Sequence, residues 1–209
     1  DVSLIRLGIP FYHLPSTSLA GGHDPRPHRR LQRFVVVGRL IPDKRVDVLI
    51  AALAGIREPW HLDVVGDGPE RIRLEQMVEV LRLRARVRFV GSQADIYPYL
   101  RESDICLFAS REEGQGMVVL EAAAAGVPVI ASDLPALREL FNEASMSFVS
   151  PQADARIWMQ IIQQVMYDPE GALERADKAR MIVEDKCSIE RMVEEYATLY
   201  HRLYAHSSR

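Results

Sequence analysis

Residues 34–66 read FVVVGRLIPDKRVDVLIAALAGIREPWHLDVVG and contain the unit on which the rest of the chain is built. Two valine-rich runs, 34–38 and 61–66, flank a segment whose apolar residues recur three and four positions apart. These residues are Val46, Leu49, Ile50, Leu53 and Ile56. Short continuous apolar runs predict strands buried on both faces, and the spacing between them predicts an amphipathic helix. Strand, helix and strand in this order are typical of parallel strands joined by right-handed crossovers.

The same alternation continues along the chain. Further apolar runs occupy residues 87–91, 104–109 and 127–131, with a weaker one at 147–149, and helical patterns replace strands after Pro151. The sequence therefore predicts an α/β fold, a doubly wound, Rossmann-like parallel sheet. In such sheets ligands bind beyond the carboxyl ends of the strands. Functional residues are accordingly expected directly after each apolar run.

Three segments are expected. Residues 1–33 include a stretch rich in Pro, Ser, Gly, His and Arg and are expected to form a linker. Residues 34–186 form the predicted domain, and 187–209 a final helix. Its apolar stripe, expected to pack or dock on another surface, comprises Ile189, Met192, Val193, Tyr196, Leu199, Tyr200 and Leu203. The chain starts at Asp1 without an initiator Met, so we expect it to be part of a longer protein.

Composition excludes several classes of function. The 209 residues include 26 Lys and Arg against 29 Asp and Glu, which gives no positive surplus for nucleic-acid binding. The most apolar stretch, 117–131, is interrupted by Glu121, Gly126 and Pro128, so no transmembrane segment is expected. The two cysteines, Cys106 and Cys187, provide neither a disulfide framework nor metal-ligand spacing. We expect a cytoplasmic protein, with peripheral attachment to the inner membrane as an open alternative.

Two cations follow the first predicted strand. Arg39 and Lys44 lie between this strand and the helix after it. Cationic side chains beside a helix amino end favour an anion such as a diphosphate. Solvated surface charges are the alternative reading of both residues.

Glycines follow the second predicted strand. Gly66-Asp67-Gly68-Pro69 is superficially similar to a dinucleotide-binding fingerprint, but Arg71 occupies the place of the third glycine. Pro69 suits the first turn of a helix. A simple glycine turn and a ligand-binding loop both remain open for this segment.

The segment after the fourth predicted strand, ASREEGQGMVVLEA at 109–122, is the richest in chemistry. Gly114 and Gly116 permit unusual backbone conformations and close approach of a ligand. Glu121 lies early in the apolar helix that follows, where an ionised carboxylate needs hydrogen-bond donors. The vicinal hydroxyls of a sugar would be suitable hydrogen-bond donors. Pairing of Glu121 with an arginine or a backbone amide is the alternative.

Together these motifs resemble the carboxyl-terminal, donor-binding domain of the retaining glycosyltransferases of family four, which have the GT-B fold. The similarity runs from about residue 34 to 141. Its motifs are Gly38-Arg39-Leu40 with Lys44, Gly66-Asp67-Gly68-Pro69, Val87-Arg88-Phe89-Val90-Gly91, Glu113-Gly114-Gln115-Gly116 with Glu121-Ala122, and Gly126-Val127-Pro128-Val129. Arg45 and Gln115 stand where the family commonly has Gly and Phe. Gly8-Ile9-Pro10 is similar to the family's interdomain segment.

The resemblance implies a role for each site residue. Glu121 would accept hydrogen bonds from the ribose diol, and Glu113 would lie near the hydroxyls of the transferred sugar. Arg39 and Lys44 would contact the diphosphate, and Arg39, Lys44 and Glu113 form the expected catalytic set. The other residues expected to contact the substrate are Gly38, Gly66, Gly68, Val90, Gly91, Gly114, Gln115, Gly116, Met117 and Val118.

The implied reaction is transfer of a sugar from a UDP- or GDP-type donor to a glycan or lipid-linked hydroxyl, with retention at the anomeric carbon. Bacterial surface polysaccharide assembly, such as that of lipopolysaccharide, is the expected setting. No Asp-x-Asp motif is present, so no metal or other cofactor is expected. The family's amino-terminal domain is the expected partner, and this domain alone is expected to be inactive. A non-catalytic nucleotide-sugar binding domain, or an epimerase or phosphorylase on the same fold, remains an alternative.

Overall fold

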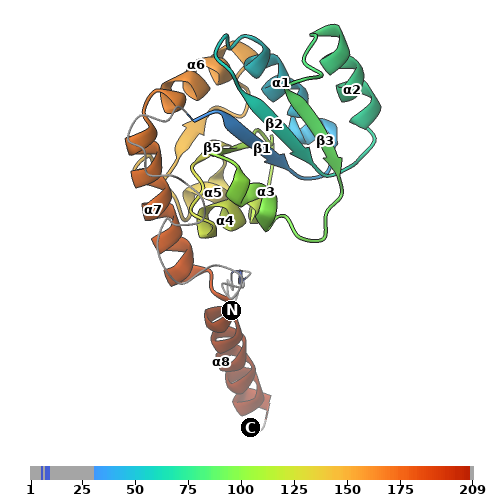
Figure 1. Ribbon diagram of the computed structural model, residues 1–209. Coiled ribbons are helices and arrows are strands. Elements are labelled where there is room, and N and C mark those ends of the chain that lie inside the picture. Colours follow the sequence, from blue (N-terminus) through green and yellow to red (C-terminus); the bar gives the residue numbers. More distant parts are fainter. Residues whose placement is uncertain (1–5, 7, 10–30, 208–209) are drawn as a thin grey trace.

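The computed structural model describes residues 6, 8, 9 and 31–207, with side chains up to residue 204. Most of the predicted linker lies outside this range. The domain contains a six-stranded, all-parallel sheet in the order β3-β2-β1-β4-β5-β6 (Figure 1). The strands are β1 Arg33–Val37, β2 His61–Val65, β3 Val87–Gly91, β4 Ile105–Phe108, β5 Val129–Ser132 and β6 Ser147–Val149. The predicted doubly wound, Rossmann-like fold is confirmed.

Helices cover both faces of the sheet (Figure 1). The helices α1 (Val46–Ala54), α2 (Arg71–Val80) and α6 (Ala155–Met166) pack on one face. On the other face lie α3 (Tyr97–Glu102), α4 (Met117–Ala124), α5 (Pro135–Arg138) and most of α7 (Pro169–Lys186). Helix α4 packs against α7, and both helices contain buried alanines, whose small side chains permit a close approach. These alanines are Ala122, Ala123, Ala124, Ala176 and Ala179.

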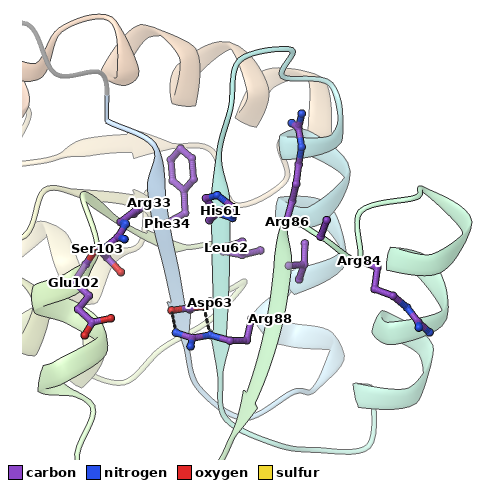
Figure 2. Close-up of a pocket in the computed structure, with 12 residues that line it drawn as sticks. Arg33, Phe34, His61, Leu62, Asp63, Arg84, Arg86, Arg88, Glu102 and Ser103 are labelled. Atoms are coloured by element: carbon purple, nitrogen blue, oxygen red, sulfur yellow. Dashed lines mark hydrogen bonds and ion pairs between the residues drawn. The ribbon is translucent and has the colours of Figure 1, made fainter.

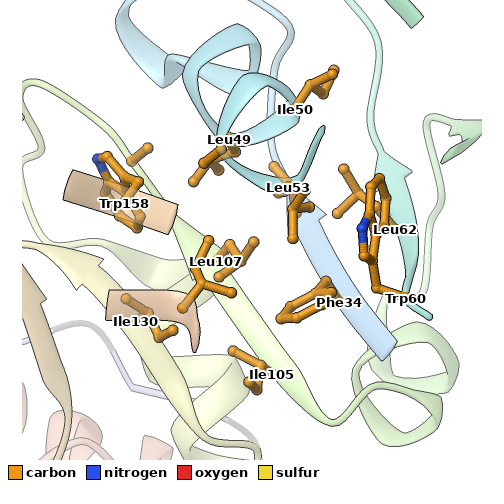
Figure 3. Close-up of a cluster of buried hydrophobic side chains, with 14 of the residues drawn as sticks. Phe34, Leu49, Ile50, Leu53, Trp60, Leu62, Ile105, Leu107, Ile130 and Trp158 are labelled. Atoms are coloured by element: carbon orange, nitrogen blue, oxygen red, sulfur yellow. The ribbon is translucent and has the colours of Figure 1, made fainter. Parts of the chain in front are cut away.

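The core on the α1 side is built from the apolar runs that the sequence indicates (Figure 3). Phe34, Leu62 and Leu107 from three strands meet Leu49 and Leu53 of α1, and all five side chains are buried. The spacing of Leu49 and Leu53 places both on one face of the helix, which explains why this segment is helical. The predicted amphipathic helix is therefore confirmed, with its end two residues earlier than Ile56.

One strand is displaced from its predicted position. The apolar run at 127–131 predicts a strand there, whereas β5 starts at Val129 and ends at Ser132. The Val127 amide is used elsewhere, since it donates to the Ala122 carbonyl and closes the turn after α4. Pro128 has no amide hydrogen to give to the sheet. Its carbonyl still accepts from Cys106 at 2.8 Å, so the ladder begins with an acceptor only.

The two edges of the sheet differ in character. The loops that follow β1, β2, β3 and β4 gather at the carboxyl edge. At the opposite, amino edge a cavity of about 420 Å³ opens beside the starts of β1, β2 and β3 (Figure 2). The arginine-rich lining of this cavity is unrelated to the predicted site residues.

The last helix, α8 (Ile189–Ser207), extends away from the sheet (Figure 1). Its start is held by residues 8 and 9: the Ile9 amide donates to the Cys187 carbonyl at 2.7 Å, and Gly8 approaches Ile189 too closely for any side chain. Farther along, the stripe faces solvent, with Val193 55%, Tyr200 65% and Leu203 56% exposed. The predicted helix and its stripe are both present. Among the described helices, none has the length and apolar character needed to cross a bilayer.

Candidate functional site

The loops after β1 and β2 interlock at the carboxyl edge. Gly66 has φ +132°, and any side chain on it would collide with the Gly38 carbonyl. The Gly38 amide donates to Val65, and the Gly66 amide donates to the Gly91 carbonyl at 2.8 Å. Gly91, at the end of β3, has φ +83°. These three predicted site glycines lie together at the top of the sheet and all have a positive φ, which favours glycine. Only at Gly66 would a side chain meet backbone, since side chains on Gly38 and Gly91 would meet the side chains of Lys44 and Arg71 at 3.9 and 3.6 Å.

Gly68 completes this contact. A side chain on Gly68 would lie 2.5 Å from the Leu40 carbonyl, which accepts a hydrogen bond from the Glu70 amide at 3.0 Å. The Leu40 amide donates to the Asp67 carbonyl at 2.9 Å. Pro69 lies in a turn before α2 rather than in its first turn, so that prediction is wrong by two residues. The segment is a glycine turn into a helix, and it also fixes the β1 loop in place.

Lys44 and Glu113 form an ion pair across the loops that follow β1 and β4. Lys44 ends the short 3-10 helix Pro42–Lys44, and its ammonium lies 5.6 Å from the centre of the Phe108 ring. The Ser110 hydroxyl donates to the same Glu113 carboxylate at 3.0 Å. Neither Lys44 nor Glu113 is a freely solvated charge, since their side chains are only 25% and 17% exposed. The structure brings these two predicted site residues into direct contact.

Arg39 lies on the same loop but remains apart from this pair. Its side chain is exposed, and within the described part of the chain no carboxylate pairs with it. The exposure of Arg39 therefore agrees with the alternative of a solvated surface charge. Its position leaves a cation available at the carboxyl edge of β1.

Helix α4 begins at this edge with unused backbone donors. Gly116 precedes it with φ +71°, and a side chain there would meet Leu137 at 2.7 Å. The Val119 and Leu120 amides bond back to Gly116, whereas those of Met117 and Val118 have no acceptor among the described residues. Two free amides and the positive end of the helix dipole suit an anionic oxygen.

The two glycines of this loop are not equivalent. Gly116 needs its left-handed backbone, as predicted, but Gly114 does not have positive φ, and a side chain on it would meet nothing within 4 Å. The conformational reason proposed for Gly114 is therefore wrong. Gly114 is exposed and Gln115 half-buried beside it.

Glu121 is a half-buried carboxylate in the second turn of α4. Burial raises the pKa of its carboxyl above the ordinary value of 4.5. No described residue donates a hydrogen bond to it or forms an ion pair with it, so the predicted alternative of an arginine or amide partner is not found in this part of the chain. Its charge acts on Cys106, where burial and Glu121 together raise the pKa of the thiol to about 12. Among the residues that the structure describes, Glu121 is thus a carboxylate without a hydrogen-bond donor.

Two residues that support the site were not predicted. Ser110 donates to Glu113, and its only sequence signal is its place two residues after a strand. Arg45, 8% exposed, donates to the carbonyls of Pro151 and Ala153, the latter at 2.6 Å. It thereby ties the β1 loop to the loop after β6. Arg45 has φ +51°, which explains why glycine is common at this position in the family that the sequence resembles.

Comparison with known proteins agrees with this architecture. The sequence model described as "Glycosyl transferases group 1" matches residues 32–168, most of the domain that carries the site. The chain belongs to this family. The resemblance to family-four glycosyltransferases with the GT-B fold is therefore confirmed.

Several glycosyltransferases are similar in sequence. The O-antigen biosynthesis glycosyltransferase WclY of Escherichia coli is 29% identical over 161 residues, which are 77% of this chain and 44% of WclY. The N-acetyl-alpha-D-glucosaminyl L-malate synthase of Bacillus anthracis is 31% identical over 160 residues, 76% of this chain and 42% of the enzyme. The chain thus spans less than half the length of these curated relatives.

Solved structures share the fold. Anabaena Alr3699/HepE, in complex with UDP and glucose, superposes with a TM-score of 0.81 over 97% of this chain and 56% of its own, at 24% identity. Sucrose-phosphate synthase from Thermosynechococcus elongatus gives a TM-score of 0.77 and 32% identity over 84% of this chain and 46% of that one. The fold is that of the GT-B glycosyltransferases.

Proposed function

We propose that this chain is the donor-binding half of a retaining glycosyltransferase, which moves a sugar from a nucleotide-diphosphate donor to a hydroxyl acceptor. One observation carries the proposal: within the described part of the chain, the half-buried Glu121 carboxylate receives no hydrogen bond, and the Met117 and Val118 amides of the same helix have no acceptor. A nucleotide supplies what each group lacks, since its ribose diol donates and its phosphates accept.

Each of the remaining site residues is assigned to one part of the donor. Lys44 and Arg39 meet the diphosphate, and Val90 with Gly91 faces the base at the end of β3. Glu113, with Gly114 and Gln115, lies toward the transferred sugar. The HepE structure in complex with UDP and glucose makes UDP the first nucleotide to test. On this reading Gly38, Gly66 and Gly68 contribute through the shape of the backbone at the site.

The chemistry follows from the charges. As the bond between the sugar and the β-phosphate oxygen loosens, negative charge grows on the leaving phosphate. Arg39 and Lys44 lower the barrier by meeting this charge with cations held in place beforehand. We propose that these side chains and the α4 amides perform the task without a divalent metal. Lys44 must leave Glu113, at least in part, to reach a phosphate.

The acceptor is proposed to lie against a second domain. Relatives such as WclY are more than twice the length matched here, and the exposed stripe of α8 offers a surface on which further chain can pack. The names of relatives point to surface polysaccharides: O-antigen for WclY, and lipopolysaccharide core for LpsD of Rhizobium meliloti, 45% identical over 101 residues. We propose a glycan or lipid-linked acceptor, in the cytoplasm or at the inner membrane.

Product analysis tests the proposal. The longest natural form of the protein is incubated with a panel of UDP- and GDP-sugars and candidate acceptors. Acceptor-dependent release of the nucleoside diphosphate, with an α-linked product from an α-linked donor, supports retaining transfer. Binding without turnover favours a non-catalytic domain, and an epimerised donor favours an epimerase. Activity that EDTA abolishes and manganese restores would refute the metal-independent mechanism.

A further inference from the structure

Arg71, the first residue of α2, has no role in the proposed function, although its side chain reaches the carboxyl edge of the sheet. A Cβ on Gly91 would lie 3.6 Å from the Nη1 atom of Arg71. A longer side chain at Gly91 would therefore crowd the guanidinium group. Gly91 ends β3 and is the residue assigned above to the base of the nucleotide. The Arg71 guanidinium thus lies beside the proposed position of the base.

Two carboxylates, each four positions away along the chain, hold this guanidinium in place. Nη1 of Arg71 donates to Asp67 at 2.9 Å, and Nε donates to Glu75 at 2.8 Å. The other oxygen of Asp67 accepts from the Gly68 amide at 2.8 Å, so this carboxylate is itself fixed. A guanidinium has five N–H donors, and no further described residue accepts from Arg71. Because its side chain is 32% exposed, Arg71 has donors that a ligand can reach.

The charges around Arg71 favour a neutral ligand group over a phosphate. The Gly68 amide and the Arg71 guanidinium lower the pKa of the Asp67 carboxyl, which is therefore charged at neutral pH. Two carboxylates on one guanidinium leave a surplus of negative charge, and a further anion would be repelled. A carbonyl oxygen accepts a hydrogen bond without adding charge. Arg71 is accordingly suited to a base rather than to the diphosphate.

A second arginine on α2 has similar partners but a different position. Arg73 pairs with Glu70 at 2.5 Å and with Asp47 of α1 at 3.1 Å. No atom of Arg73 lies within 4 Å of the place that a Cβ on Gly91 would occupy. Arg71 and Arg73 therefore share residue type, helix and two carboxylate partners, and only Arg71 lies at the end of β3.

We propose that Arg71 selects the base of the nucleotide by donating a hydrogen bond to a keto oxygen. This inference rests on the proposed donor-binding function. Uracil and guanine carry a keto oxygen that accepts, whereas cytosine and adenine carry an amino group at the corresponding ring position, which donates. A guanidinium has no acceptor, so an amino group in this place would set donor against donor. Arg71 thus favours UDP- and GDP-type donors over CDP- and ADP-type donors.

Calorimetry of the full chain with UDP and CDP tests this inference, because the two nucleotides share the ribose and the diphosphate. The wild type is expected to bind UDP about tenfold or more tightly than CDP. In Arg71→Met the UDP affinity should fall to near that of CDP, while the CDP affinity does not fall. Partly exposed ion pairs contribute little to stability, so the variant should keep its fold. The control Arg73→Met loses the same charge and should keep the preference for UDP.

Several results would overturn the inference while UDP still binds and the proposed function stands. These are a preference for UDP that survives in Arg71→Met, a preference that falls equally in Arg71→Met and Arg73→Met, and equal binding of UDP and CDP by the wild type. If neither pyrimidine nucleotide binds, GDP and ADP provide the same comparison of a keto with an amino group. Binding of none of the four nucleotides would contradict the proposed donor-binding function, and this inference with it.

Discussion

Lys44 and Glu113 pair directly with one another, joining the loops that follow β1 and β4. In the proposed function these residues serve different parts of the donor, Lys44 the diphosphate and Glu113 the sugar. The ion pair therefore holds both side chains at the site before the donor arrives. Glu113 and a phosphate of the donor also compete for Lys44, because its ammonium group cannot pair fully with both anions at once.

Replacing Lys44 should weaken nucleotide binding. Lys44→Met removes a charged donor to the diphosphate, so the UDP affinity measured by calorimetry should fall about tenfold or more. Glu113→Gln frees Lys44 and should leave UDP affinity unchanged or improve it, while turnover in the complete enzyme falls. Lys178→Met, on α7 and paired with Glu174, is the matched control and should bind UDP normally. Equal UDP affinity in Lys44→Met and the wild type would remove Lys44 from the site.

Glu121 should lower the free energy of unfolding at neutral pH while strengthening UDP binding. Burial raises the pKa of its carboxyl in the folded protein, so folded molecules keep this proton at pH values where unfolded ones release it. Glu121 therefore lowers the free energy of unfolding progressively as pH rises from the unfolded value of 4.5 through the folded pKa. Glu121→Gln should be at least as stable as the wild type at neutral pH, with a weaker decline over this range.

The same variant should bind UDP less tightly, because an amide accepts the ribose diol less well than a carboxylate. Thermal unfolding from pH 4 to pH 8 and calorimetry with UDP measure the two effects on one protein. Other carboxyls, such as those of Asp133 and Glu143, titrate alike in both forms and cancel in the difference. Unchanged UDP affinity would contradict the ribose assignment, and an unchanged pH profile would contradict the effect of burial.

Much of this architecture follows from the sequence, and the exceptions have physical causes. The apolar runs identify all six strands of the described sheet, most clearly β4 and β5, in which every residue is buried. The sequence does not show the Lys44–Glu113 contact, between residues 69 positions apart. Nor does it show that no described residue donates to Glu121, because both depend on how the loops meet. Gly66 and Gly114 look alike in sequence. Only the surrounding backbone shows that one is structurally required and the other is not.

This difference gives a paired prediction. Gly66→Ala should unfold or severely destabilise the chain, because the new methyl group collides with the Gly38 carbonyl and no flexible side chain can yield. Gly114→Ala meets no atom within 4 Å and should leave the melting temperature unchanged. If the donor approaches Gly114 closely, Gly114→Ala should nevertheless weaken donor-sugar binding. Melting curves and calorimetry with the nucleotide sugar check both parts; equal stability of the two variants would contradict the first.

Arg45 should contribute to stability despite its unfavourable backbone. The left-handed conformation, φ +51°, costs a non-glycine residue about 1 kcal/mol. Its buried guanidinium donates to the carbonyls of Pro151 and Ala153, and hydrogen bonds to a charged group contribute about 1.5–3 kcal/mol. Both Arg45→Ala and Arg45→Gly lose the guanidinium hydrogen bonds. Alanine still bears the cost of the left-handed backbone, whereas glycine adopts this conformation without strain. In urea unfolding, both variants should have a lower free energy of unfolding than the wild type, and Arg45→Gly should be about 1 kcal/mol more stable than Arg45→Ala.

Arg82 provides the control for this comparison. Arg82 also has a left-handed backbone, φ +57°, but its side chain is exposed. No described residue accepts a hydrogen bond from the Arg82 guanidinium. Arg82→Gly should therefore raise the free energy of unfolding, the opposite of Arg45→Gly. Since Arg45 adjoins Lys44, loss of its bonds should also loosen the β1 loop and weaken UDP binding, which Arg82→Gly should not do. An Arg45→Gly variant as stable as the wild type would show that the guanidinium bonds add nothing to the fold.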